Sequence, residues 1–211
     1  MADVAAPRAL ALKSSGDRPD DAQNARERLF AAALESFSTK GFHGTTTRDI
    51  ARAAGLSPAA MYVHYSTKED LLYAISKAGH DWSLAVVRSA AASATDPVQQ
   101  LAALAHDFTL EHAQRHTRAR IVNYELAALS PEHRAEIVAI RRAIEAQFYE
   151  VLQAGADTGQ FVIPDVRMTT RALVSLGVDT ARWFMETGRW TAEQVAQHHS
   201  LMALRMVGAA P

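Results

Sequence analysis

Residues 44–65 read GTTTRDIARAAGLSPAAMYVHY, and this stretch decides the fold. Thr46 precedes Asp49 by three residues, a spacing that opens a short helix with a capping box. Gly55 permits the positive φ of a tight turn, and the small residues around it let two helices approach closely. A Ser-Pro pair at 57–58 then supplies an N-cap and a proline at the first position of a second helix. The stretch therefore predicts a helix-turn-helix.

Helical signals continue on both sides of this motif. Upstream, apolar residues at 30, 33, 34 and 37 form one helical face and predict a helix over about 21–40, with Gly41 as its stop. Downstream, Ser66 and Glu69 have capping-box spacing and predict the start of a long fourth helix over about 68–92. Further helix starts are predicted at Asp96-Pro97, Ser130-Pro131, Pro164-Asp165 and Thr191 with Gln194.

No run alternates polar and apolar residues over the length of a strand, so the sequence predicts an all-α fold of about nine helices. Residues 1–19 lack periodicity and are expected to form a flexible arm. Residues 20–75 should form a three-helix helix-turn-helix domain. Residues 76–211 should form a larger helical bundle for ligand binding and dimerisation.

Composition narrows the class of protein. The chain has 211 residues, of which 48% are hydrophobic, so it can bury a real core. It has no cysteine, which excludes disulfides, thiolate metal sites and a cysteine nucleophile. The net charge of −1 gives no support for non-specific coating of nucleic acid. Uncharged runs are too short for a membrane span or a signal peptide, so we expect a cytoplasmic protein with no membrane partner.

The region from Ala25 to Ala74 resembles the TetR family of transcriptional regulators. The ordered pieces that carry the resemblance are Gly41-Phe42, the run TTRDIA at 46–51, AGLS at 54–57 and MYVHYSTKEDLL at 61–72. The resemblance implies a sequence-specific, ligand-responsive DNA-binding repressor. It also implies a homodimer that faces a near-palindromic double-stranded operator, because one short recognition helix reads too few base pairs.

The resemblance assigns DNA-contacting roles to matching positions. It implies phosphate or base contacts at the start of the first motif helix, a groove-facing turn at the start of the second, hydrogen bonds to the DNA backbone near its end, and a phosphate-contacting lysine just beyond. These residues are Thr47 and Arg48, then Ser57, Pro58, Ala59 and Ala60, then Tyr62 and His64, and finally Lys68. Ala59 and Ala60 have no side-chain donor or acceptor, so recognition there must use thymine methyls or DNA shape.

The bundle is expected to hold a small-molecule inducer. Its aromatic residues offer apolar walls and few polar groups converge among them, which suits a hydrophobic acid or an acyl-CoA thioester. The candidate ligand-binding residues are Trp82, His106, Phe108, Asn123, Tyr124, Phe148, Arg182 and Trp183. A short pattern at 181–184 and 191–195 is similar to regulators of fatty-acid and steroid catabolism, and Arg182 is expected to pair with the ligand's anionic part.

The resemblance also implies a dimer interface built from the last two long helices, about 168–186 and 191–207. Their apolar stripes are compatible with this role and comprise Leu173, Leu176, Leu201, Leu204 and Val207.

Two alternatives from other classes stay open. An all-α metal-dependent enzyme would use His106, His112 and His116, of which the last two lie four residues apart on one helical face. A helical adaptor would carry the helix-turn-helix without its DNA function. Because no catalytic motif stands out, we predict no enzyme activity, no bound metal and no cofactor.

Overall fold

The computed structural model describes residues 19–209, with side chains from Ala22 onward. Over this range the protein is all-α, with nine α-helices, one short 3-10 helix and no strand. The helices are α1 (Pro19–Gly44), α2 (Thr47–Ala53), α3 (Pro58–His64), α4 (Lys68–Ala92), α5 (Pro97–Gln114), α6 (His116–Tyr124), the 3-10 helix η1 (Leu126–Ala128), α7 (Pro131–Asp157), α8 (Val166–Trp183) and α9 (Ala192–Met206). The predicted fold class and helix number are confirmed. Residues 1–18, which hold most of the predicted arm, lie outside the described part.

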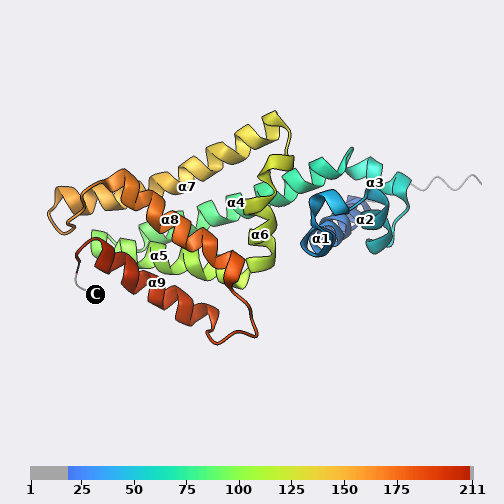
Figure 1. Ribbon diagram of the computed structural model, residues 1–211. Coiled ribbons are helices and arrows are strands. Elements are labelled where there is room, and N and C mark those ends of the chain that lie inside the picture. Colours follow the sequence, from blue (N-terminus) through green and yellow to red (C-terminus); the bar gives the residue numbers. More distant parts are fainter. Residues whose placement is uncertain (1–18, 210–211) are drawn as a thin grey trace, which may run out of the picture.

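The molecule has two unequal ends joined by one helix. Figure 1 shows α1, α2 and α3 gathered at one end, while α5 and α7–α9 form a bundle at the other. Helix α4 runs from the first group into the second without interruption. The predicted domain boundary at residue 75 therefore falls inside a continuous helix.

Side-chain caps define the short helices of the N-terminal end. At the start of α2, Thr46 Oγ1 accepts a hydrogen bond from the Asp49 amide, and the Asp49 carboxylate accepts one from the Thr46 amide, each at 3.2 Å. At the start of α3, Ser57 Oγ accepts from the Ala60 amide at 3.1 Å. Both predicted caps are confirmed. Gly41, the predicted stop, has φ of 70° and breaks the regular helix before α1 ends.

The turn between α2 and α3 is held from α1. Gly55 has φ of 65°, in the left-handed region that favours glycine. The guanidinium of Arg28 donates to the carbonyl oxygens of Ala54 and Gly55, so a charged group satisfies the peptide oxygens of the turn. A Cβ at position 55 would lie 2.7 Å from Arg28 Nη2. The backbone angle therefore favours glycine, and any larger residue would also displace the Arg28 guanidinium from its carbonyl partners.

The cap of α4 differs by one residue from the prediction. The capping box is formed by Thr67 and Asp70, not by Ser66 and Glu69. Glu69 instead accepts a hydrogen bond from the Ser130 amide at 2.8 Å and contacts His133 Nδ1 at 2.9 Å. It is thus committed to the start of α7, a long-range partner that local spacing cannot indicate.

The bundle core corrects the expected dimer stripe. Of the five predicted interface residues, Leu173, Leu204 and Val207 are buried in the protein's own core with residues of α4, α5 and α7. Only Leu176 and Leu201 are partly exposed. Helix α8 also ends earlier than expected, at Trp183, where Phe184 turns into extended backbone and becomes buried. The apolar period of these helices mainly encodes intramolecular packing.

We predict that Gly55→Ala destabilises the protein by more than Gly159→Ala. Both glycines have positive φ, at 65° and 76°, so each alanine should lose about 1–2 kcal/mol from backbone strain. A Cβ at 159 meets nothing within 4 Å, whereas one at 55 meets Arg28. Urea unfolding of both variants measures the difference. Equal losses would mean that the Arg28 contact contributes nothing to stability.

Candidate nucleic-acid interface and candidate ligand cavity

The first helices present an exposed recognition surface. Ser57, Pro58 and Ala59 at the start of α3 are exposed, and Tyr62 on the same helix is 53% exposed. The Tyr62 hydroxyl lies 3.3 Å from Thr47 Oγ1 and so links α3 to the first turn of α2. These residues come from two helix starts, whose free backbone N–H groups favour phosphate.

The remaining predicted contacts surround this surface. Arg48 is exposed at the start of α2, while Ala60 and His64 are partly buried. His64 lines a surface crevice together with Tyr65 and Asp70. Tyr65 itself is buried in the core of the N-terminal unit. The structure therefore brings the start of α2 and the exposed side of α3 together, with His64 at their margin.

Most cations of the N-terminal unit are engaged within it. Residues 20–75 hold six Lys or Arg and seven Asp or Glu. Besides Arg28, Arg26 donates to the Tyr65 hydroxyl at 3.3 Å and Arg52 pairs with Asp49 at 2.5 Å. Only Arg48 and Lys40 lack a side-chain hydrogen bond or ion pair among the described side chains. Attraction to phosphate therefore depends on few free charges.

Lys68 has a structural role that the sequence did not indicate. Its ammonium donates to the carbonyl oxygens of Phe42 and Thr45, at 2.7 and 2.8 Å, and lies 4.3 Å from the centre of the Phe42 ring. These bonds tie the first residue of α4 to the last turn of α1 and to the residue that follows this helix. A phosphate contact would have to share an ammonium group that already serves this junction.

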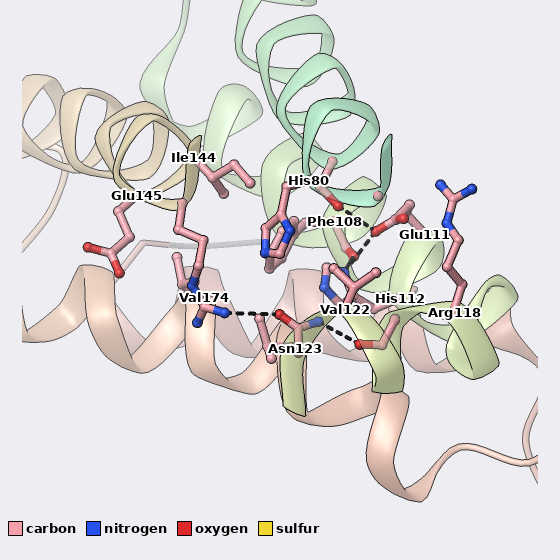
Figure 2. Close-up of a pocket in the computed structure, with 15 residues that line it drawn as sticks. His80, Phe108, Glu111, His112, Arg118, Val122, Asn123, Ile144, Glu145 and Val174 are labelled. Atoms are coloured by element: carbon pink, nitrogen blue, oxygen red, sulfur yellow. Dashed lines mark hydrogen bonds and ion pairs between the residues drawn. The ribbon is translucent and has the colours of Figure 1, made fainter. Parts of the chain in front are cut away.

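A cavity lies inside the bundle, between α4, α5, α6, α7 and α8 (Figure 2). Its apolar walls include Phe108, Val122, Ile144, Val174 and Val178. The cavity has a volume of about 40 Å³, which is little more than room for one or two water molecules. A larger ligand must therefore push the walls apart.

Polar side chains face this cavity from two sides. The Glu111 carboxylate, 8% exposed, accepts from Ser83 Oγ and contacts His112 Nδ1, each at 3.0 Å. Burial tends to raise the pKa of Glu111, but the bonds to His112 and Ser83 outweigh it and hold the pKa below its ordinary value. On the other side, Arg141 donates to Asn123 Oδ1 at 3.3 Å.

His80 faces the same space from α4. Its Nδ1 lies 2.8 Å from the carbonyl oxygen of Ser76, and its Nε2 is buried without a partner. Burial lowers the pKa of His80 to about 4, so the ring is neutral at physiological pH. Figure 2 shows the imidazole projecting from α4 into the cavity.

Only two of the eight predicted ligand residues line this cavity, namely Phe108 and Asn123. Phe148 lies behind Phe108 in the core, with the ring centres 5.5 Å apart. Tyr124 and Arg182 line a separate surface crevice of about 440 Å³ between α1, α6 and the end of α8. There Arg182 pairs with Asp179 at 2.9 Å.

The other three predicted ligand residues also lie elsewhere. Trp82 is half-exposed and stacks under Arg115 in an outer groove between α4 and α5. His106 contacts Asp107 and Glu193 at 2.8 and 2.9 Å. Trp183 is half-exposed near α9. The aromatic residues thus do not converge on one cavity as expected, because several of them lie half-exposed at the outer surface of the bundle.

Sequence reasoning missed several polar residues of the cavity, among them His80, Ser83, Glu111 and Arg141. A signal was present for part of this set. Ser76, His80 and Ser83 recur at i, i+4 and i+7, so they form a polar stripe on the buried face of α4. Polar side chains on the inward face of a helix need hydrogen-bond partners, and a cavity that admits water or a ligand can provide them.

The histidine cluster of the enzyme alternative is not assembled. His112 is held by Phe108 and Glu111, His116 contacts the Ala113 carbonyl at 3.0 Å, and His106 bonds to acidic residues of α5 and α9. Over residues 22–209, the one group with metal-ligand proximity is Glu69, Asp70 and His133. The first two of these also accept hydrogen bonds from backbone amides at helix starts.

Comparison with known proteins gives consistent matches along the chain. Residues 29–75 match the family described as bacterial regulatory proteins, tetR family, and residues 94–207 match the tetracyclin repressor-like C-terminal domain. A crystal structure of a tetR-family regulatory protein from Rhodococcus RHA1 is 41% identical, with a TM-score of 0.85, covering 89% of this chain and 98% of that one.

Two further matches concern a repressor named KstR2. The HTH-type transcriptional repressor KstR2 of Mycolicibacterium smegmatis is 28% identical over 192 residues, covering 89% of this chain and 93% of the relative. The structure of the ketosteroid transcriptional regulator KstR2 of Mycobacterium tuberculosis is 26% identical, with a TM-score of 0.78, covering 85% and 93%. Separately, none of the helices over 19–209 has the length and apolar character needed to cross a membrane.

We predict that Lys68→Met lowers the stability of the protein by about 1–3 kcal/mol, because the carbonyl oxygens of Phe42 and Thr45 lose a charged hydrogen-bond donor. Lys40→Met is the matched control, since Lys40 is exposed and unpaired among the described side chains. Thermal and urea unfolding measure both. Equal stability of the two variants would contradict a structural role for Lys68.

Proposed function

Because this chain belongs to the tetR family of bacterial regulatory proteins, we propose that it is a homodimeric repressor released from its operator by a small hydrophobic or acyl-CoA-type ligand. Family membership makes it a ligand-responsive, DNA-binding regulator of transcription. Repression is supported by the similarity to KstR2. A cytoplasmic location is part of the proposal, since the operator is there.

The proposed DNA contact uses the exposed start of α3 in the major groove. Tyr62, Thr47 and Arg48 border it and are placed to hold the DNA backbone. A single seven-residue helix reads few base pairs. Two copies related by a two-fold axis would read a near-palindrome and gain the missing discrimination. Exposed residues at the end of α8 and in the following loop, such as Met185 and Trp190, favour a dimer contact there.

The observation that carries the ligand proposal is the position of α6. Its Val122 lines the cavity, and a Cβ on Gly79 of α4 would meet this valine at 2.8 Å. Val122 and the neighbouring Ile121 also belong to the core of the N-terminal unit, together with Phe37 of α1. A ligand that widens the cavity by moving α6 or α4 therefore acts on helices that both pack against the N-terminal unit.

The ligand acts through a difference in affinity between two arrangements of these helices. In the DNA-competent arrangement the cavity is nearly filled, and in the ligand-bound arrangement it is open. Binding to the open arrangement alone shifts the N-terminal units away from operator spacing. Arg182, the residue expected to pair with an anionic ligand group, lies outside the cavity. An acidic group of a ligand inside the cavity would therefore pair with Arg118 or Arg141 instead.

For DNA binding, we expect Arg48→Ala to weaken operator binding and to lower the salt slope by about one unit per subunit, without loss of stability. Arg52→Ala is the control, because Asp49 already balances the Arg52 charge. Fluorescence anisotropy on promoter fragments at several salt concentrations gives both slopes. Unchanged affinity and slope in Arg48→Ala would remove this arginine from the interface.

For the ligand, we expect Val174→Phe to retain operator binding and to lose release by ligand, because the larger side chain fills the cavity. Val162→Phe is the matched control, since Val162 is exposed and outside the cavity. Short-, medium- and long-chain acyl-CoA thioesters would be tested for operator release and for a shift in melting temperature. If none has an effect on the wild-type protein, the acyl-CoA class is wrong while the DNA-binding function stands.

A further inference from the structure

One buried acceptor in the cavity has no partner. Among the described side chains, the buried polar atoms without a hydrogen bond are Ser76 Oγ and His80 Nε2. Only His80 lines the cavity, where it is 4% exposed. Buried polar atoms of native proteins are nearly always paired with protein or water, so an unpaired one inside a cavity points to a missing partner.

The proton on the His80 ring can be placed. The Ser76 carbonyl oxygen can only accept a hydrogen bond, so Nδ1, at 2.8 Å, carries the hydrogen. A neutral imidazole has one N–H, and the other nitrogen is then an acceptor. Nε2 therefore presents a lone pair to the cavity, and the backbone of α4 fixes this tautomer. Its partner must be a donor.

The neighbouring groups restrict the donor further. The Glu111 carboxylate also faces the cavity and accepts hydrogen bonds, so a carbonyl or carboxylate of the ligand would meet two acceptors on this side. A second cation near His80 is disfavoured by burial and by the positive charge of Arg141, which lines the same cavity, and these effects exceed the attraction of the Glu111 carboxylate. A neutral O–H group satisfies both conditions. The surrounding walls of Phe108 and Val178 are apolar, so the rest of the buried ligand must be hydrocarbon.

We propose that the buried end of the inducer is a hydroxylated hydrocarbon whose O–H donates to Nε2 of His80. This inference rests on the proposed function, since it names the chemistry of the ligand in the same cavity. It applies to the buried end only and holds whether or not the other end carries a thioester. Neutral alcohols are thereby distinguished from the corresponding ketones and amines.

The test compares menthol, menthone and menthylamine as probes that share a ring but differ in the polar group. Full-length protein is titrated with each compound, and binding is followed by the shift in melting temperature and by calorimetry. Menthol should bind roughly tenfold more tightly than menthone, because the ketone leaves the buried acceptor unpaired. Menthylamine should also bind more weakly than menthol.

Two variants assign the preference to His80. His80→Phe keeps a flat ring without the acceptor and should bind menthol and menthone equally. His80→Gln offers an amide oxygen in place of Nε2 and should restore part of the preference. Val178→Ala, which alters an apolar wall, should weaken both probes and keep their ratio.

Several results would overturn the inference. They are menthone or menthylamine binding as tightly as menthol, a menthol preference that survives in His80→Phe, and no binding of menthol at all. The last result includes the case in which a permanent water satisfies His80. If menthone or an acyl-CoA releases the operator while menthol does not, the cavity remains the inducer site and only the hydroxyl assignment fails. If Arg48→Ala and wild type bind DNA alike, the interface assignment fails independently of the probes.

Discussion

The ammonium group of Lys68 joins the two ends of the molecule. It donates to the carbonyl oxygens of Phe42, in the last turn of α1, and of Thr45, just after this helix, while Lys68 itself begins α4, the helix whose middle lines the cavity. The capping box of Thr67 and Asp70 fixes the same helix end. The contact of Glu69 with the start of α7 secures it from the other side. Because one uninterrupted helix is anchored at its first turn and lines the cavity further along, a change in the cavity has a direct mechanical route to the DNA-contacting helices.

The N-terminal unit achieves its shape by using its cations internally. Arg28 satisfies the carbonyls of the helix-turn-helix turn, and Lys68 does the same for the neighbouring junction. Charged donors to backbone oxygens are strong, so they hold two short helices that would be marginal alone. The consequence is a surface with few free charges, of which Arg48 is the exposed example next to α3. Under the proposed function, selectivity for an operator would depend more on DNA shape and apolar contact than on general attraction to phosphate.

The cavity combines a small volume with an unpaired polar atom. Closing the apolar walls stabilises the bundle, whereas the buried acceptor of His80 is left without a partner. These two effects oppose each other. A ligand with a hydrogen-bond donor would pair the acceptor of His80, but it would also separate the packed apolar walls. Helix α6 lies between this cavity and the core that it shares with α1, so a change in the cavity walls would also change the packing of that core. A regulator needs two arrangements of similar free energy, and this balance is one physical source of them.

The sequence by itself determined the helices and their local caps. Thr46 with Asp49, Ser57 before Pro58, and the glycines at 41 and 55 act through neighbours a few residues away, so their spacing predicted the helix-turn-helix correctly. Tertiary structure alone decided which polar groups share the cavity and which apolar stripes face inward. His80 and Glu111 are 31 positions apart in the chain, and Leu204 could pack against its own bundle or against a second copy. Such choices depend on how helices distant in sequence cross, because hydrophobic burial has no direction and period alone cannot name the partner.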